Sequence, residues 1–385
     1  MDLKKLEVQE LLNLDDIESE EMLYLKKYGY FPFNVSTWNP SSYFSQKFLD
    51  HQLELPSLDY ISYIYSYELN HNLINTVESN LGGNNLGCTI VNTGTSAISL
   101  VTSVLKQVHV KRVLLVCPIY YSVIYNFLEK GIAVDNVYMH RKNNGYALPR
   151  EEIMNKIAEV DAIWITNPIY NTGIYLDIDD INFLKCAIPS RITLICDDCF
   201  ANCGMEMVRY LGSRPQYISI HDPLKQIMIN GLKFSCVLYS LQYEHIFEQW
   251  SDIVCGSLSY STLQSVEFFI SEKFKQIRLE LQSHFLKMDK YFEELSREFP
   301  LISIDNRDRL GHMRMCYMHH LPFDFLEDKE NLHNFIDETG TSIIPGNRFH
   351  FLNNCGFCFR VNYGRECSEF WDALIQIFIY LSEHN

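Results

Sequence analysis

The chain has 385 residues, of which 47% are hydrophobic and 14% aromatic, values typical of a globular protein rather than a disordered one. Its formal net charge of −16 argues against nucleic acid or an anionic membrane surface as a partner. No run of about eighteen apolar residues occurs, and the acidic start lacks the apolar segment of a signal peptide. We therefore predict a cytoplasmic protein of about two or three domain-sized units, without a membrane span, whose cysteines stay reduced.

The first fifty residues predict an acidic amphipathic helix followed by an irregular aromatic segment, Phe31–Phe44. A further helix is expected from Asn70 to Leu81, and it ends at Gly82 and Gly83 because glycine tolerates the left-handed conformation that closes many helices. Several tyrosines stand between residues 60 and 67, just before this helix. Both aromatic segments favour either a pocket for a bulky or apolar substrate side chain or an interface between subunits.

From residue 88 onward, strand-like and helix-like segments alternate along the chain. The predicted strands are Cys88–Asn92, Val113–Cys117, Ala133–Met139, Ala162–Thr166, Ile192–Cys196, Tyr217–Ile220 and Phe234–Tyr239. The predicted helices are Thr93–Gln107, Ile119–Lys130, Arg150–Val160 and Asp179–Ala187. Strands separated by helices are typical of a mostly parallel sheet that is covered by helices on both faces.

The last third of the chain departs from this alternation. Ser261–Phe299 predicts one long helix or two with a break, and short strands then precede a terminal helix at Ser368–Ser382. The expected fold class is therefore α/β, with a large three-layer domain over residues 51–265. A small α+β domain would combine residues 1–50 with residues 266–385.

Two groups of cysteines have a spacing that is found in metal sites: Cys196, Cys199 and Cys203, and Cys355 with Cys358. The first group straddles the end of an apolar strand, and the second lies in an aromatic stretch with strand-like alternation. Buried free cysteine is the commoner state of such residues. We therefore predict no metal, with a zinc or iron–sulfur site as the alternative.

Polar residues gather where the predicted parallel strands end, which is the edge at which ligands bind such sheets. Thr93–Ser96 opens a helix whose free N–H groups suit a phosphate, although the same residues are ordinary helix caps. Pro118–Tyr121 places aromatics past one strand, and Asn167–Gly173 forms a polar turn past another. Asp197 and Asp198 follow a third strand, where a buried carboxylate needs a cationic or hydrogen-bonding partner.

Lys225 stands between two apolar runs, Tyr217–Ile220 and Phe234–Tyr239, with Pro223 before it and Gly231 after it. Apolar neighbours desolvate a lysine, which favours its neutral amine and makes it a nucleophile toward carbonyls. Taken alone, a lysine is more often a solvated surface residue. The polar segments upstream of Lys225 are what favour a chemical role for it.

In order and spacing, these segments resemble the fold-type I pyridoxal-phosphate enzymes, specifically the class I/II aminotransferase superfamily. The resemblance runs from about Tyr60 to the C-terminus. It is carried by TGTSA at 93–97, the P-x-Y that begins at Pro118, NPIYNTG at 167–173, the aspartate pair at 197–198, Lys225 with Gly231 and Lys233, and PGNRF followed by FRVNY at 345–363. Each motif is modest alone, and the ordered set is fairly specific.

The resemblance implies a catalytic role for Lys225, which would form a Schiff base with pyridoxal 5'-phosphate and later shuttle a proton. Asp197 would pair with the pyridine nitrogen and keep it protonated, so that the ring withdraws electrons. Tyr120 would stack on the face of the ring. A buried structural acid is the alternative role for Asp197.

The resemblance also assigns the phosphate, the substrate and the subunit interface. Gly94, Thr95 and Ser96, with the cation of Lys233, would hold the phosphate. Arg360, the arginine of the FRVNY motif, and Asn171 are assigned to the substrate carboxylate, with a surface ion pair as the alternative role for Arg360. In a homodimer, one of Tyr63, Tyr65 and Tyr67 could reach the neighbouring active site.

Five positions depart from the family pattern. Tyr170 replaces the asparagine that binds the cofactor's phenolic oxygen, and Phe200 replaces a tyrosine that binds the same oxygen. The two changes could compensate each other, with one phenol lost and another gained, or both residues could be core aromatics. Asp222 and Leu224 stand where serine or threonine is usual, and Lys233 where arginine is usual. We still assign Tyr170, Phe200 and Asp222 to the cofactor site.

The default activity is transfer of an amino group from an amino acid to a 2-oxo acid. Other fates of the same substrate carbanion are the alternatives: β- or γ-elimination or replacement, cyclisation, or decarboxylation, which a carboxylate-binding Arg360 disfavours. A protein that keeps the fold without turnover is a further alternative, as is a cysteine-ligated metal protein. His221, beside Asp222, is either a proton carrier or, more commonly, a loop histidine with satisfied hydrogen bonds.

Overall fold

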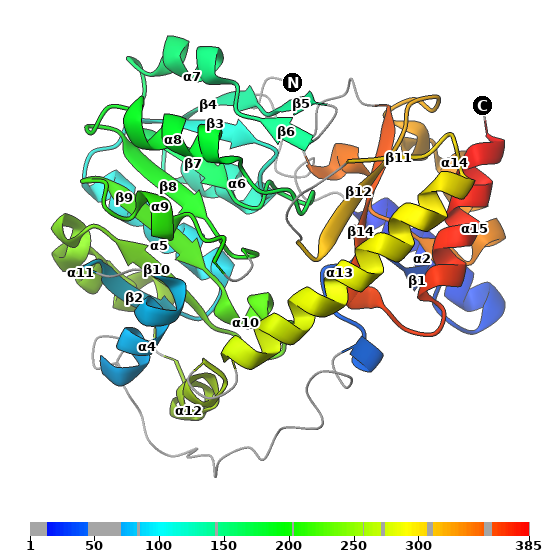
Figure 1. The fold of residues 1–385 in the computed structure, drawn as a ribbon, viewed down its shortest axis with the longest axis horizontal. Helices are drawn as coiled ribbons and strands as arrows, with labels where there is room; N and C mark the ends of the chain where they lie inside the picture. Colours follow the sequence, from blue (N-terminus) through cyan, green and yellow to red (C-terminus); the bar gives the residue numbers. More distant parts are fainter. Residues whose placement is uncertain are drawn as a thin grey trace.

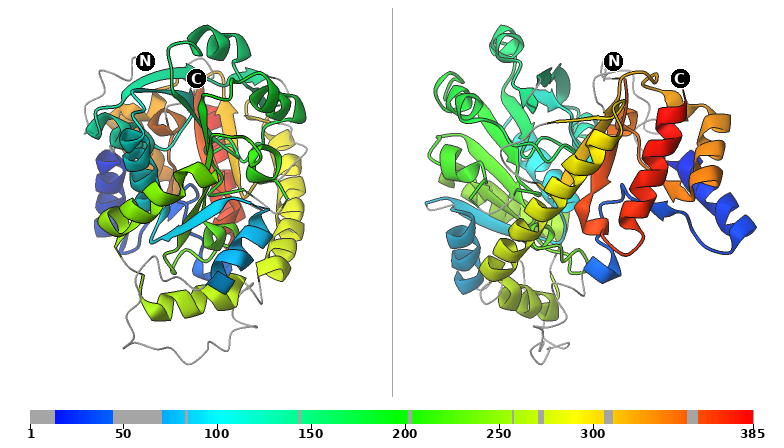
Figure 2. Two further views of the ribbon diagram at one scale, coloured as in Figure 1. Left: turned by 90° about the vertical axis from the view of Figure 1, so that its left-hand side faces the viewer. Right: turned by 45° about the vertical axis from the view of Figure 1, so that its right-hand side comes forward.

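The computed structural model describes residues 14–44, 71–82, 85–142, 145–201, 204–256, 258–270, 274–305, 311–349 and 356–384. In this part of the chain two lobes are visible, a large one around a seven-stranded sheet and a small one around a three-stranded sheet (Figure 1). The long helix α13 (Phe274–Glu298) runs from one lobe to the other, as Figure 1 and the right-hand view of Figure 2 show.

The large sheet has the strand order β2-β10-β9-β8-β7-β3-β4. Its strands are β2 (Gly87–Val91), β3 (Arg112–Cys117), β4 (Ala133–Tyr138), β7 (Ala162–Thr166), β8 (Thr193–Asp197), β9 (Tyr217–His221) and β10 (Ser235–Tyr239). All neighbouring pairs are parallel except the two that involve β10. The predicted α/β class with a mostly parallel sheet is confirmed, and the seven predicted strands all form.

The strands of this sheet are buried on both faces, which explains why they read as continuous apolar runs. Because side chains alternate across a strand, Leu114 and Val116 contribute to one apolar cluster while Val113 and Leu115 contribute to the other. Burial of each such side chain stabilises the fold by about 1.5–3 kcal/mol relative to exposure. The two clusters hold helices on both faces, so the large lobe has three layers.

The described helices of the large lobe follow the predictions in most places. They are α4 (His71–Leu81), α5 (Gly94–Gln107), α6 (Tyr121–Glu129), α7 (Arg150–Lys156), α8 (Ile178–Cys186), α9 (Val208–Leu211), α10 (Pro223–Gln226), α11 (Glu244–Cys255) and α12 (Tyr260–Phe268). Helices α9, α10 and α11 are additions to the predicted set. The stretch predicted as one long helix or two with a break consists of α12 and α13.

The small lobe joins the two ends of the chain. Its elements are α2 (Asp15–Tyr28), β1 (Phe33–Asn34), β11 (Ser303–Ile304), β12 (Met313–Met318), α14 (Lys329–Thr339), β13 (Thr341–Ser342), β14 (Phe357–Asn362) and α15 (Phe370–Glu383). Strand β1 pairs in parallel with β13, with Phe33 opposite Thr341. The N-terminal segment is therefore tied to the last third of the chain; the predicted boundaries at residues 50 and 265 stay a prediction.

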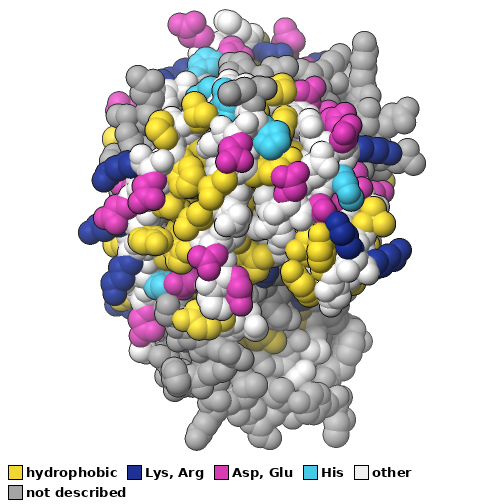
Figure 3. All heavy atoms as spheres, turned by 90° about the vertical axis from the view of Figure 1, so that its right-hand side faces the viewer, with side chains coloured by type: hydrophobic (Ala, Val, Ile, Leu, Met, Phe, Trp, Pro, Cys, Tyr) yellow, Lys and Arg dark blue, Asp and Glu magenta, His cyan; other side chains and the backbone are white. Residues whose placement is uncertain are grey.

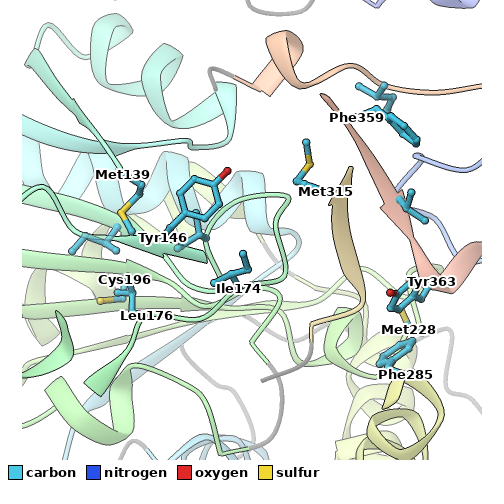
Figure 4. Close-up of a cluster of buried hydrophobic side chains, with 14 of the residues drawn as sticks. Met139, Tyr146, Ile174, Leu176, Cys196, Met228, Phe285, Met315, Phe359 and Tyr363 are labelled. Atoms are coloured by element: carbon cyan, nitrogen blue, oxygen red, sulfur yellow. The ribbon is translucent and has the colours of Figure 1, made fainter. Parts of the chain in front are cut away.

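The two lobes share one apolar core. A single buried cluster contains Met139, Tyr146 and Ile174 from the large lobe together with Met315 and Phe359 from the small lobe (Figure 4). Contacts of this kind exclude water between the lobes and hold their facing edges in register. The carboxyl ends of the large sheet's strands consequently lie against a packed neighbour.

A polar network near this core adds hydrogen bonds between the lobes. The hairpin of β5 (His140–Lys142) and β6 (Gly145–Ala147) carries Tyr146, whose hydroxyl lies 2.7 Å from that of Tyr317 on β12. Tyr317 donates in turn to Asp305 Oδ2 at 2.6 Å. The short, polar strands of this hairpin lack the apolar alternation by which a strand is recognised, so the sequence did not predict them.

The outer face of the small lobe mixes acidic, basic and hydrophobic side chains (Figure 3), in keeping with an acidic protein of net charge −16. Tyr291 and Trp371 pack edge to face on α13 and α15, with ring centroids 4.4 Å apart. Among the described residues, no helix combines the length and the apolar character that crossing a membrane requires.

Candidate functional site

Lys225 lies in a single turn of helix at the carboxyl end of β9. The strand ends at His221, and Asp222 then caps α10 by accepting the backbone N–H of Lys225 at 3.2 Å. Pro223 occupies the first helical position, where its missing N–H costs no hydrogen bond. The local sequence therefore places the lysine where ligands bind a parallel sheet.

The charge of Lys225 is set by a carboxylate. Its Nζ lies 3.2 Å from Asp222 Oδ2, and its side chain is 21% exposed. Burial alone lowers the pKa of this ammonium, but Asp222, and more weakly Asp197, raise it above the ordinary lysine value. The expectation of a neutral amine is therefore wrong. It considered only the desolvation by apolar neighbours, whereas the nearby carboxylate of Asp222 stabilises the charged form.

The two adjacent aspartates have different surroundings. Asp197 ends β8, and its Oδ1 accepts the backbone N–H of Cys199 at 3.2 Å. Asp198 turns away and accepts from Asn167 Nδ2 at 3.2 Å and from the Met207 N–H at 2.8 Å. Burial raises the pKa of both carboxyls. Asp197 interacts electrostatically with Lys225, whereas Asp198 ties two loops together.

The first turn of α5 lies beside the lysine. Thr93 caps this helix by accepting the Ser96 N–H at 3.0 Å, so the following N–H groups open the helix as predicted. A Cβ added to Gly94 would lie 3.5 Å from both Cys199 Sγ and Lys225 Nζ. The structure therefore brings the TGTS segment, which includes Thr95, and Lys225 to the same place.

Arg360 lies on β14 of the small lobe and is 5% exposed. Its Nε donates to the Ser36 carbonyl at 2.7 Å, and its Nη1 donates to Asn171 Oδ1 at 2.5 Å. Burial lowers the pKa of Arg360 to about 10. Asn171 adopts a left-handed backbone with φ 64°, and its buried Nδ2 finds no hydrogen-bond partner among the described residues. The two residues predicted to bind the substrate are thus in direct contact.

Aromatic side chains lie close to Lys225 and to Arg360. The rings of Tyr120 and Tyr170 have centroids 6.0 Å apart, and Phe200 has its ring centroid 5.2 Å from Lys225 Nζ. Burial raises the pKa of Tyr170 to about 12, although Arg360 opposes the shift, so this phenol stays a hydrogen-bond donor at neutral pH. Tyr170, Asn171 and Phe200 line a pocket together with His312 and Met313 of the small lobe.

Trp38 is a site residue that the sequence did not single out. Its ring centroid lies 5.4 Å from Lys225 Nζ and 5.3 Å from Lys233 Nζ, and its carbonyl accepts Asn230 Nδ2 at 3.3 Å. Lys233 is exposed and donates to the Asn230 carbonyl at 3.1 Å. The only signal for Trp38 in the sequence was its place in the aromatic segment 31–44. No local pattern in the sequence indicates that this segment folds next to Lys225.

Several sequence-based predictions fall elsewhere. Tyr63, Tyr65, Tyr67, Cys203 and Cys355 lie outside the described residues. In the described part of the chain, no group of three or more His, Cys, Asp or Glu side chains is placed to hold a metal ion. Three cysteines of the two groups lie in the described part of the chain, and all three are buried free thiols: Cys196, Cys199 and Cys358.

His221 ends strand β9 rather than lying in a loop. Its Nε2 lies 2.9 Å from Ser219 Oγ. Burial, with the nearby charges of Arg278 and Arg209, lowers the pKa of His221 to about 3, so the imidazole is neutral at neutral pH. A neutral, fully buried imidazole favours the reading of a structural histidine over that of a proton carrier.

The fold itself is that of the pyridoxal-phosphate-dependent enzymes of fold type I, and several aminotransferases are among the solved structures that are similar to this one. The alanine aminotransferase from Pyrococcus furiosus is similar with a TM-score of 0.74 and 13% identity, over 98% of this chain and 100% of that one. The histidinol-phosphate aminotransferase from Clostridium acetobutylicum is similar with a TM-score of 0.66 and 17% identity, over 91% and 100%.

The same fold also carries other chemistry. A pyridoxal-phosphate-bound C-S lyase from Staphylococcus hominis is similar with a TM-score of 0.67 and 13% identity, over 92% of this chain and 87% of that one. No protein-family model and no curated protein sequence matches the chain. At these identities the likeness establishes the fold.

Proposed function

We propose that the protein is a pyridoxal-phosphate-dependent enzyme that acts on an amino acid through Lys225, and that its reaction is transamination to a 2-oxo acid. The observation that carries this proposal is the convergence of Lys225, Asp197 and the first turn of α5 at one edge of the sheet. Arg360 bonds Asn171, which lines a nearby pocket together with Tyr170. A reactive amine, a buried acid, an anion site and a carboxylate-binding cation are the groups that this chemistry needs.

The described residues fit the cofactor. The position that Gly94 leaves open beside Lys225 Nζ gives room next to the amine, and Asp197 offers a buried carboxylate at the adjacent strand end. When bound, pyridoxal 5'-phosphate supplies an aldehyde and a pyridine ring that withdraws electrons from the substrate. Asp197 would accept the N–H of that ring, and Tyr120 would pack against its face.

Further residues would complete the cofactor site. Gly94, Thr95 and Ser96 would donate to the phosphate from the start of α5, with Lys233 as a nearby cation. The Tyr170 hydroxyl, which burial keeps protonated, would donate to the cofactor's phenolic oxygen in place of the tyrosine that Phe200 replaces. A Tyr170→Phe variant with an unchanged visible absorption spectrum would contradict this last assignment.

Arg360 and Asn171 would bind the α-carboxylate of the substrate. The guanidinium matches a carboxylate in a two-bond arrangement, and the unsatisfied Nδ2 of Asn171 offers a further donor beside it. Binding of the carboxylate at this end would direct Cα toward Lys225, which then takes and returns the Cα proton. Asp222, at 3.2 Å from Nζ, is an acceptor for the proton that the amine must first release.

An assignment of the oligomeric state and one of the cellular location belong to the same proposal. We propose a homodimer in which Tyr63, Tyr65 or Tyr67 reaches the neighbouring active site, since enzymes of this family form active sites between subunits. We also propose the cytoplasm as the location, because free thiols persist there and the described cysteines are free. Sedimentation of the purified protein tests the first, and a monomeric protein with full turnover would contradict it.

A second candidate reaction is elimination or replacement at the substrate side chain, which the similarity to a C-S lyase on the same fold favours. The other fates of the carbanion, cyclisation and decarboxylation, share Lys225 and the cofactor. An arginine that holds the carboxylate by charge-assisted bonds disfavours decarboxylation. Stoichiometric conversion of the cofactor to pyridoxamine phosphate on addition of an amino acid would separate transamination from all of these.

The decisive experiment is the visible spectrum of the protein with pyridoxal 5'-phosphate before and after borohydride, followed by peptide mapping. We expect a visible band that reduction removes and a cofactor adduct fixed on Lys225. Lys185, an exposed lysine of α8, serves as the internal control and should carry no adduct. A protein that shows no band with excess cofactor would contradict the proposal.

A further inference from the structure

The carboxylate of Asp222 lies close to the start of α5. Its Oδ2 lies 3.2 Å from Lys225 Nζ and accepts from Ser235 Oγ at 3.2 Å. Lys225 Nζ and Ser235 Oγ in turn lie 3.5 Å and 3.9 Å from the position that a Cβ on Gly94 would take. Both direct partners of Asp222 Oδ2 therefore lie beside the first turn of α5.

The carboxylate of Asp222 is held in place and cannot easily turn away. Its Oδ1 accepts the Lys225 backbone N–H, while its Oδ2 bonds Ser235 and the Lys225 ammonium. The residue is 5% exposed, so water screens its charge only weakly. Any anion that binds at the start of α5 would therefore have a fixed negative charge nearby.

Among the described residues, the titratable groups that interact with Asp222 are Lys225 on its own helix, Asp197 and Cys199 at the end of β8, and Cys236 on β10. Burial raises the pKa of the Cys199 thiol, and a hydrogen bond with Cys88 together with burial raises the pKa of the Cys236 thiol, so both are neutral at neutral pH. Lys225 is the one cation of this set, and Asp197 adds a second carboxylate. A further cation, the exposed Lys233, has its Nζ 5.3 Å from the centroid of the Trp38 ring.

We propose that Asp222 controls the charge state in which the site accepts the cofactor's phosphate. The phosphate then binds together with one proton, which the Asp222–phosphate pair takes up. This inference rests on the proposed function, since it assumes that the phosphate lies at the start of α5. Shared protonation removes the repulsion between two anions that face each other in a poorly hydrated space. The raised pKa that burial gives Asp222 works in the same direction.

The proposal predicts a specific pH dependence. Uptake of one proton weakens binding by up to about tenfold for each unit of pH above neutrality. Pyridoxal has the same ring and aldehyde but no phosphate, so it shares the Lys225 chemistry and lacks the linked proton. The ratio of the dissociation constants of pyridoxal and pyridoxal 5'-phosphate should therefore fall as the pH rises.

The experiment titrates both compounds into the full-length, cofactor-free protein between about pH 6 and pH 9, a range around the pKa of a phosphate, and follows absorbance. Two neutral variants, Asp222→Ser and Asp222→Asn, test the residue, and serine can also cap α10. Asp179→Asn, which removes an exposed carboxylate in the first turn of α8, is the control. We expect the selectivity for the phosphorylated compound to fall with pH in the wild type and in Asp179→Asn, and to stay level or rise in both Asp222 variants.

Each outcome bears on the proposal. A wild-type selectivity that stays level or rises with pH overturns the inference, as does a falling selectivity that survives in a folded Asp222 variant, and both leave the proposed function intact. Failure of the wild type and the folded variants to bind either compound at any pH overturns the proposed function, and the inference with it.

Discussion

Lys225 and Arg360 are two cations of the candidate site, the first half-buried and the second buried, and their surroundings are opposite in character. Lys225 faces the Asp222 carboxylate, and its pKa is raised. Arg360 donates to a backbone carbonyl and an amide oxygen, and its pKa is lowered to about 10. Burial pushes both values down, so the contacting oxygens decide the difference. A cation beside a carboxylate can exchange a proton locally, whereas one beside neutral oxygens keeps its attraction for an incoming anion.

The largest expected effect is at the lysine end. Lys225→Ala should remove the covalent attachment of the cofactor and lower turnover by at least about 10²–10⁴-fold, because both the attachment and the proton transfer depend on its amine. The measurement is the rate of amino-group transfer together with borohydride mapping. Lys185→Ala, at an exposed position of α8, should behave as the wild type does. Turnover near the wild-type rate in Lys225→Ala would show that the chemistry does not pass through this residue.

The arginine end should show a large but substrate-dependent effect. Arg360→Gln should lower kcat/KM for an amino acid by about 30-fold or more. Truncating one partner of a buried charge pair costs about 2 kcal/mol or more, which corresponds to this factor. Arg360→Lys should lie between, since it keeps the charge and loses the two-bond geometry. The matching amino-acid amide, which carries no carboxylate, is the control substrate. Equal losses for the acid and the amide would argue against carboxylate binding.

The carboxylate that distinguishes the two cations can be removed directly. Asp222→Asn should lower the pKa of Lys225, and a lower pKa leaves more neutral amine at a given pH. Labelling of Lys225 by an amine reagent in the cofactor-free protein should therefore speed up by about tenfold for each unit by which the pKa falls. Lys185, labelled in the same sample, gives the internal reference. An unchanged ratio of the two labelling rates would mean that Asp222 does not set the lysine's charge.

The smallest expected effect concerns the amide beside Arg360. Asn171→Gly removes the side chain while tolerating the left-handed φ of 64° at this position. Losing one hydrogen-bonding group should reduce kcat/KM for an amino acid by about two- to tenfold, with little change in thermal stability. The amide substrate again separates carboxylate binding from a general loss of activity, because it should be less affected. A loss larger than that of Arg360→Gln would reverse the proposed ranking of the two residues.

Much of the fold could be predicted because its signals are local. The strand Ala162–Thr166 has the predicted bounds, since a short apolar run between polar turns can hardly do anything else in a buried sheet. The helix that begins at Gly94 follows from its Thr93 cap, and the end of β9 and the turn after it follow from Pro223. These signals also placed Lys225 and Asp197 at the same edge of the sheet.

Other features were decided only by tertiary packing. Trp38 reaches Lys225, Asn171 bonds Arg360, and β1 pairs with β13 across intervals of chain that no local pattern measures. The neutral amine was mispredicted for the same reason: desolvation can be judged from neighbouring residue types, whereas the charge of a buried lysine depends on where a carboxylate oxygen lies. The sequence by itself thus determined the elements and the residues at their ends. The packing of the two lobes decided which of those residues meet, because side-chain distances depend on the whole fold.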